Sequence, residues 1–108
     1  MAQNFRRYIA RNVGTSASTL FTANSYDTVI GIALANTTSS EIKVDVYIND
    51  GSNDYYLIKN APIQTGGALQ IIDGGAKYVI QSADVLKVVS NTASSCDVWV
   101  SAVDAISD

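Results

Sequence analysis

The residue types that most often carry out chemistry are sparse in this chain. Its 108 residues include no histidine, which removes the commonest general base and metal ligand and every Ser-His-Asp arrangement. The single cysteine, Cys96, lies in an alternating segment whose apolar side we expect to be buried, and no base is near it in sequence. We therefore interpret Cys96 as a core thiol and expect a protein that is not an enzyme.

The best candidate for a ligand site is the stretch Asn49-Asp50-Gly51-Ser52-Asn53-Asp54. Its closely spaced oxygen donors could hold Ca²⁺. Asn and Asp beside Gly are also what a hairpin turn needs, because these residues tolerate positive φ. The spacing differs from that of an EF-hand loop and lacks its closing Glu, so the sequence favours a turn and leaves calcium open. The other acidic residues are scattered through turns, and no cofactor is expected.

Large apolar side chains on expected solvent faces are more informative. If Cys96, Val98 and Val100 point inward, Trp99 points outward. The same alternation in residues 41–49 predicts that Tyr47 points to solvent. Tyr55 and Leu57 share one face of the strand that follows. Trp and Tyr are enriched in subunit interfaces, so these four residues predict an interface. The alternative is a sheet face covered by a loop or by the N-terminal segment.

Charge is low and unevenly placed. Charged residues make up 16% of the chain, against roughly 25% in ordinary soluble proteins. The net charge is −3, yet Arg6, Arg7 and Arg11 all lie in the first eleven residues, and a basic segment on an acidic body can dock on an acidic neighbour. The basic stripe of a nucleic-acid binder and the apolar run of a membrane span are both missing, so we expect a protein partner. The lone cysteine fits a reducing compartment, and the start of the chain lacks the apolar core of a signal peptide.

The elements that position these residues follow a period of two. In residues 41–49 the apolar side chains alternate with polar ones without a break, which predicts a strand with one buried face. Similar segments, separated by turn residues, predict about eight or nine short strands in an all-β antiparallel sandwich. They are residues 5–13, 19–22, 28–36, 41–49, 55–59, 68–72, 77–81, 85–90 and 95–103.

The domain organisation expected is an N-terminal basic arm or edge strand over residues 1–12, followed by a single β-sandwich domain over residues 13–108. Three local expectations go with it. Ile30, Ile32 and Leu34 should point inward, which leaves the small residues of that strand, with Val29, on a face that another backbone could approach. Pro62 should end the fifth strand, and Asp73-Gly74-Gly75 should form a tight hairpin turn.

Several turn and strand motifs resemble those of small virion structural proteins of tailed bacteriophages, notably phages that infect cyanobacteria. The motifs are Arg11-Asn12-Val13-Gly14-Thr15-Ser16, Ala35-Asn36-Thr37-Thr38, Val44-Asp45-Val46, Lys59-Asn60-Ala61-Pro62-Ile63, Gly66-Gly67, Gly74-Gly75-Ala76-Lys77, Asp84-Val85-Leu86-Lys87-Val88 and Ser94-Ser95-Cys96-Asp97-Val98. The resemblance covers most of the chain from about Arg11. The sequence departs from it in the tyrosine-rich stretch Asp54-Tyr55-Tyr56-Leu57 and in Cys96.

The resemblance implies a jelly-roll-like sandwich that builds virions without catalysis. Such a protein is made in the host cytoplasm and placed on the particle, where it contacts the major capsid protein or another virion protein as a homo-oligomer, with a trimer the first expectation. A head decoration or cement protein is the first reading, and a neck, tail or baseplate component is the second. A carbohydrate-binding module for receptor recognition is the rival class, because exposed Tyr and Trp beside Asp and Asn suit sugar stacking.

Overall fold

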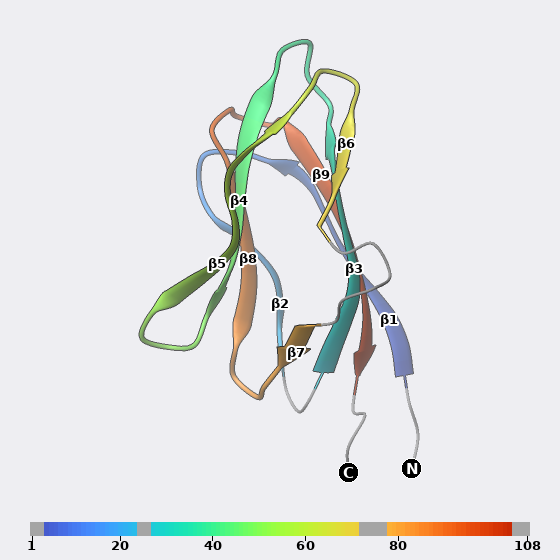
Figure 1. Cartoon of the computed structure of the whole chain (residues 1–108), viewed down its shortest axis with the longest axis vertical. Helices are drawn as coiled ribbons and strands as arrows, with labels where there is room; N and C mark the ends of the chain where they lie inside the picture. Colours follow the sequence, from blue (N-terminus) through green and yellow to red (C-terminus); the bar gives the residue numbers. More distant parts are fainter. Residues whose placement is uncertain (1–3, 24–26, 72–77, 105–108) are drawn as a thin grey trace.

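The structure, a computed structural model, describes residues 4–23, 27–71 and 78–104, and these residues form two antiparallel sheets. The five-stranded sheet contains β1 (Asn4–Val13), β9 (Cys96–Asp104), β3 (Asp27–Asn36), β6 (Ala68–Gln70) and β7 (Tyr78–Ile80). The four-stranded sheet contains β2 (Ser18–Thr22), β8 (Val85–Ser90), β4 (Ile42–Asn49) and β5 (Asp54–Ile63). The sheets face each other as a sandwich (Figure 1), as the alternating segments predict.

The order of pairing is that of a jelly roll. The first half of the chain pairs with the second half in reverse order: β1 with β9, β2 with β8, β3 with β6 and β7, and β4 with β5. Further pairings of β9 with β3 and of β8 with β4 complete the two sheets. The chain is therefore one long antiparallel hairpin rolled into two layers, the architecture of viral capsid and lectin domains.

The core lies between the layers and follows the predicted alternation closely. In β9 the inward Cys96, Val98 and Val100 are buried, and in β8 Leu86 and Val88 are completely covered. Each large apolar side chain that is fully buried stabilises the fold by roughly 1.5–3 kcal/mol. Because β-branched residues fill the central strands, the pleated backbone and the packed interior favour the same conformation.

The alternation expected in β3 is wrong at its start. Val29 is 1% exposed and points inward, whereas Ile30 is only half-buried. A β-bulge between Val29 and Gly31 places one extra residue, Ile30, in β3 and reverses the faces of the residues before it. Beyond the bulge, Ile32 and Leu34 are buried as predicted.

Two other local expectations are also wrong. Strand β5 continues through Pro62, which pairs with Lys43, because β5 is an edge strand and a missing amide on its outer side costs no ladder bond. Strands β6 and β7 both run antiparallel to β3, at different places along it, so they follow one another on one edge and do not form a hairpin. The turn Asp73-Gly74-Gly75 itself lies outside the described residues.

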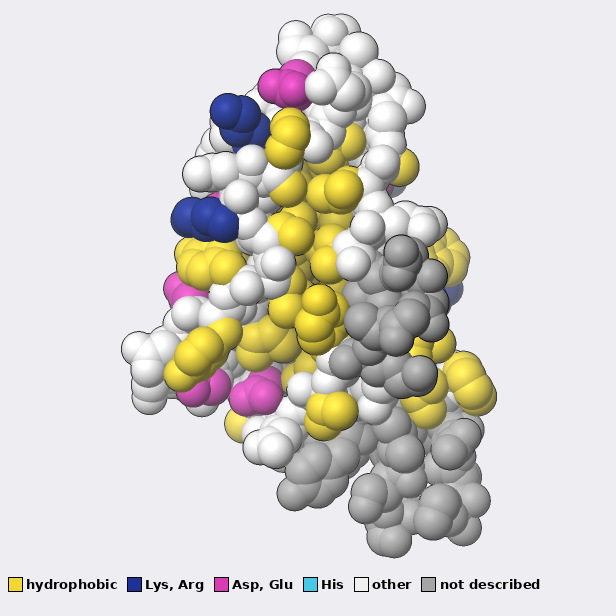
Figure 2. All heavy atoms as spheres, in the orientation of Figure 1, with side chains coloured by type: hydrophobic (Ala, Val, Ile, Leu, Met, Phe, Trp, Pro, Cys, Tyr) yellow, Lys and Arg dark blue, Asp and Glu magenta, His cyan; other side chains and the backbone are white. Residues whose placement is uncertain are grey.

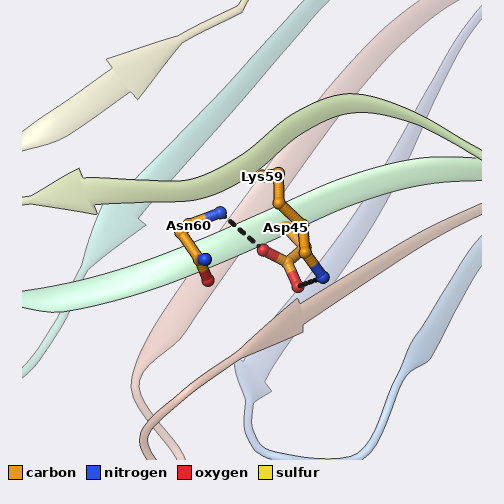
Figure 3. A network of polar contacts seen from close by, with 3 residues as sticks. All are labelled: Asp45, Lys59 and Asn60. Carbon is orange, nitrogen blue, oxygen red and sulfur yellow. Dashed lines mark hydrogen bonds and ion pairs between the residues drawn. The ribbon is translucent and has the colours of Figure 1, made fainter.

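Two matched bulges interrupt the edge strands. In β5 an extra residue opposite Asp45 puts Asn60 in the left-handed region at φ 53°, and the Asn60 amide donates to Asp45 Oδ1 at 2.7 Å. Asp45 Oδ2 also lies 3.4 Å from Lys59 Nζ (Figure 3). In β1 the same arrangement recurs: Asn12 has φ 54°, and its amide donates to Asp97 Oδ1 at 3.0 Å.

One side of the sandwich is less tightly closed than the other. On the β1–β2 side the rings of Tyr8 and Phe21 stack at 4.3 Å between centroids. Although β1 is the edge strand of its sheet, it therefore contributes to the packing between the sheets. On the β5–β6 side hydrophobic side chains reach the surface in a band between the sheets (Figure 2). The partly buried side chains that pack on the core here are Leu57, Ile58 and Ala61 of β5, Leu69 of β6, Ile71 just after β6, and Tyr78 of β7.

Candidate interaction surface

Large exposed apolar side chains gather on the outer face of the five-stranded sheet. Among the described residues, six large hydrophobic side chains are exposed, and four of them lie on this sheet. They are Phe5 at 73%, Ile9 at 53%, Val79 at 68% and Trp99 at 51% exposure. Their cross-strand partners place them on the face that points away from the core. The outward orientation predicted for Trp99 is confirmed.

The strand register creates a hollow in the middle of this face. Ile9 lies opposite Trp99, and Trp99 lies opposite Ala33, so two large side chains stand beside a small one. In the next row Ala35 lies opposite Ala68. Because alanines form the floor while Ile9 and Trp99 rise above it, the face encloses a hollow of about 360 Å³. The sequence predicted that small residues of β3 share one face, and the structure places Ala33 and Ala35 there. Val29, expected on the same face, points inward instead.

Of the three N-terminal arginines, Arg11 lines this hollow and Arg7 contacts its Trp99 wall. The guanidinium carbon of Arg7 lies 5.7 Å from the centroid of the Trp99 ring, a cation–π contact. Arg11 and Asp97 line the hollow itself. Arg6 lies opposite Ala102, whose side chain points inward, so Arg6 projects from the other side of β1. We name the hollow, with Arg7 and Arg11, the basic groove.

The remaining exposed aromatic residues form a second surface on β5. Tyr55 is 56% exposed and Tyr56 is 45% exposed. The Tyr56 ring lies 5.0 Å from Tyr47 between centroids, and Lys59 Nζ lies 4.4 Å from the centroid of the Tyr56 ring. We name the β4–β5 turn, with Tyr55 and Tyr56, the tyrosine hairpin.

The structure does not expose all four predicted interface residues. Tyr47 is only 9% exposed, because its cross-strand neighbours Tyr56 and Lys87 cover it on the outer face of the four-stranded sheet. Burial, followed by the nearby carboxylate of Asp54, raises the pKa of the Tyr47 phenol. Leu57 is an extra residue in a bulge of β5 and packs against the core. Tyr47 does point outward as predicted, but the expectation that Tyr47 and Leu57 are exposed is wrong.

The possible calcium stretch forms the turn between β4 and β5. Asn49 Oδ1 accepts the Gly51 amide at 2.8 Å, and Asp50 Oδ1 accepts the amides of Ser52 and Asn53 at 2.9 and 2.8 Å. These hydrogen bonds, from Asn53 first and then Ser52, lower the pKa of Asp50. The side-chain oxygens thus hold the turn, and no group of three acidic, Cys or His residues that could bind a metal occurs in the described parts of the chain.

Cys96 has the properties of a core thiol. Its side chain is fully buried, and burial, assisted by the charge of Asp97, raises its pKa to about 11. A thiol at neutral pH without solvent access is a poor nucleophile. Its burial and raised pKa therefore fit the interpretation of Cys96 as a core thiol.

Sequence reasoning missed three exposed residues, Phe5, Ile9 and Val79, and gave no interface role to Tyr56. The alternation in residues 5–9 already puts Phe5 and Ile9 on one side, so that signal was present in the sequence. Only the pairing of β1 with β9 shows that Ile9 on this side of β1 lies beside Trp99. Separately, the described residues contain no helix with the length and apolarity needed to cross a membrane.

The comparison with solved structures finds a likeness to this chain. No protein-family model matches the chain, and no curated protein matches it in sequence. Among solved structures, the chain is similar to one from "Acidic stable capsid structure of Helicobacter pylori bacteriophage KHP30", with a TM-score of 0.60 and 13% identity. The alignment covers 95% of this chain and 87% of that chain. At this identity the likeness establishes a shared fold.

Proposed function

We propose that this protein is a structural component of a bacteriophage virion, and that it decorates and cements the head through contacts between many copies. Three observations support the proposal: the motif resemblance, the jelly roll, and the fold likeness to a chain of a phage capsid structure. Since the alignment spans most of both chains, that neighbour is also a small protein of similar length. A neck, tail or baseplate position is the second candidate.

The observation that carries the proposal is the uncovered apolar face of the five-stranded sheet. Scattered single hydrophobic residues on a surface are ordinary, but contiguous exposed patches mark interaction sites. Here Ile9 and Trp99 stand on adjacent strands beside an alanine floor, and Phe5 is exposed farther along β1, in a chain with 16% charged residues. Such a face is suited to burial against another protein, either a sister copy or the capsid shell.

The proposed mechanism is contact without catalysis. A single rim ion pair, such as Arg11 with a carboxylate of a neighbour, contributes about 0.2–1 kcal/mol. Reinforcement of a shell then comes from many copies that bind together, because linked contacts act at high effective concentration. The groove arginines, Arg7 and Arg11, would meet an acidic part of the neighbour, and Arg6 would contact it from the other side of β1.

A specific observation bears on carbohydrate binding, the rival function. Sugars stack on exposed aromatic faces, and Trp99 is half-exposed. However, the Arg7 guanidinium already lies over the Trp99 ring, 5.7 Å from its centre, and would compete with a stacking sugar. Tyr56 is likewise engaged by Lys59 at 4.4 Å. Rings already engaged by cations suit a protein interface better, because Arg and aromatic residues together dominate binding hot spots.

Substitution Trp99→Ala tests the proposal. Because half of the ring is exposed, we expect the isolated domain to lose about 1–2 kcal/mol of unfolding free energy, less than the roughly 3–5 kcal/mol of a core aromatic truncation. Occupancy on gradient-purified phage particles, measured by quantitative mass spectrometry, should fall steeply. The control is Thr19→Ala, which truncates an exposed side chain on the four-stranded sheet, away from the apolar face.

Two results would contradict the proposal. The wild-type protein could be absent from purified particles, or Trp99→Ala particles could retain full occupancy. A density map of the particle distinguishes head from tail positions. Binding of the isolated protein to a glycan array, lost in Trp99→Ala, would instead favour receptor recognition.

A further inference from the structure

The molecule carries two unlike interaction surfaces on opposite sides. The basic groove is a hollow on the outer face of the five-stranded sheet. The tyrosine hairpin belongs to the other sheet, and Figure 1 shows the β4–β5 hairpin extending outward on the left, away from the five-stranded sheet at the right. One side of the protein therefore has a projection and the other side has a recess.

The two surfaces also match in chemistry. The groove offers an alanine floor with Ile9 and Trp99 as walls, and the hairpin offers the exposed rings of Tyr55 and Tyr56. A tyrosine buries a large apolar ring and keeps a polar end, so it suits an apolar recess with a polar rim. The residues that could fill the groove are thus present on the same chain.

The charges at the two surfaces are complementary. Arg7 and Arg11 border the groove, while Asp50 and Asp54 lie at the turn of the hairpin. Asp97 also lines the groove, but its Oδ1 accepts the Asn12 amide at 3.0 Å. Two grooves placed face to face would bring arginines against arginines, and two hairpins would bring carboxylates against carboxylates. Like charges facing each other across an interface are unfavourable, so the pairing of groove with hairpin is favoured.

We propose that the tyrosine hairpin of one copy docks in the basic groove of a second copy, so that copies join head to tail. This is a heterologous contact, which generates a ring when the rotation between copies closes and an open chain when it does not. The inference rests on the proposed function for its biological setting, because it names the sister copy as the occupant of the apolar face.

The contact can be tested with one variant on each side. Ala33→Glu fills the groove with bulk and negative charge on an outward position of β3, and Tyr55→Ser removes the exposed ring from the hairpin. Each variant alone should weaken self-association by about tenfold or more, the effect expected for a hot-spot residue. The control Thr19→Glu introduces the same charge on β2, away from both the groove and the hairpin, and should leave association unchanged.

Mixing the two variants gives the decisive result. A head-to-tail contact needs one intact groove and one intact hairpin, so an equimolar mixture should form a one-to-one dimer, seen by light scattering after size exclusion. Circular dichroism and unfolding midpoints should show that both variants are folded. Native mass spectrometry should find one copy of each variant in the dimer, because the two substitutions give the chains different masses.

Three outcomes would overturn the inference. The wild-type chain could stay monomeric at about 1 mM, a concentration at which even a weak specific contact is populated. Tyr55→Ser could associate like the wild type, or the mixture could stay monomeric although both variants fold. Particle occupancy separates this inference from the proposed function. If wild-type copies are present on particles but do not make the groove–hairpin contact, only this inference fails. If the protein self-associates through this contact but is absent from particles, only the proposed function fails.

Discussion

The side chain of Asn36 provides a sharp test of how this jelly roll is held at one end. Asn36 closes β3, is 5% exposed, and connects three segments. Its Nδ2 donates to the carbonyls of Ser40 at 2.8 Å and Ile63 at 2.9 Å. Its Oδ1 accepts the amide and the hydroxyl of Thr38, both at 2.8 Å. The β3–β4 connection is thereby tied to the end of β5.

The expected cost of Asn36→Ala follows from these four bonds. Each intramolecular hydrogen bond contributes a net ~0.5–1.5 kcal/mol, and a buried group left without a partner costs ~1–3 kcal/mol. The Ile63 carbonyl is the buried partner, whereas the groups of Thr38 and Ser40 lie nearer to water. We therefore expect a loss of roughly 2–4 kcal/mol, a large share of the ~5–15 kcal/mol that holds a domain.

Urea unfolding followed by circular dichroism measures this loss. The midpoint should fall while the slope stays constant, because the substitution leaves the exposed surface of the unfolded chain almost unchanged. Asn53→Ala, in the exposed β4–β5 turn, is the matched control and should stay within about 0.5 kcal/mol of the wild type. A loss below about 1 kcal/mol for Asn36→Ala would refute the reasoning, since water would then replace the lost bonds.

A companion variant separates hydrogen bonding from shape. Asn36→Asp keeps the size and the acceptor but turns a carboxylate toward the carbonyls of Ser40 and Ile63. Burial should raise the pKa of the new carboxyl above its value in the unfolded chain. The variant should therefore be least stable at neutral pH and regain stability as the pH falls through that raised pKa.

Two further predictions concern single residues. Asn12→Ala should lower the free energy of unfolding in urea by about 1–2 kcal/mol, because Asn12 has φ 54° and alanine disfavours this region. Asn12→Gly should cost much less, because glycine adopts positive φ readily. Equal losses in the two variants would contradict the role of backbone conformation. The pKa of Tyr47 is raised above its ordinary value of 10.0, so the stability it contributes should be complete below that value and decline as the pH rises through the folded pKa. Tyr47→Phe should flatten this alkaline decline, and an unchanged slope would exclude Tyr47 as its source.

Much of the architecture could be predicted from the sequence, because the buried faces of β4, β8 and β9 alternate in type at nearly every position. The errors fall where a bulge adds a residue. The bulge at Ile30 reverses the start of β3, and the bulge at Leu57 turns a residue expected outside toward the core. A period of two gives no warning of an inserted residue, since one extra position exchanges the faces of everything before it.

The location of the candidate surface could not be predicted, because it depends on which strands pair and in which register. The period of two in the sequence does not give this information. Trp99 and Arg7 were singled out for separate reasons, and the register of β1 with β9 brings them within 5.7 Å. The same register places Ile9 beside Trp99 and creates the groove. Tyr55, in contrast, lies on the other sheet, so the single interface expected from sequence becomes two surfaces in the structure.

The two matched bulges help to explain why contacts between copies would use faces instead of sheet edges. An edge strand with free amides and carbonyls invites pairing with another chain, and proteins blunt such edges with bulges, proline and charge. In β5 the edge is interrupted by the Asp45–Asn60 bulge and by Pro62.

In β1 the regular stretch ends at the Asp97–Asn12 bulge and carries Arg6 and Arg7. Strand addition at β1 and at β5 is therefore disfavoured, while the apolar outer face of the five-stranded sheet stays open. Contacts through a face favour a single geometry of assembly. Strands that pair at an edge can slip in register, whereas an aromatic ring seated in a recess has one position.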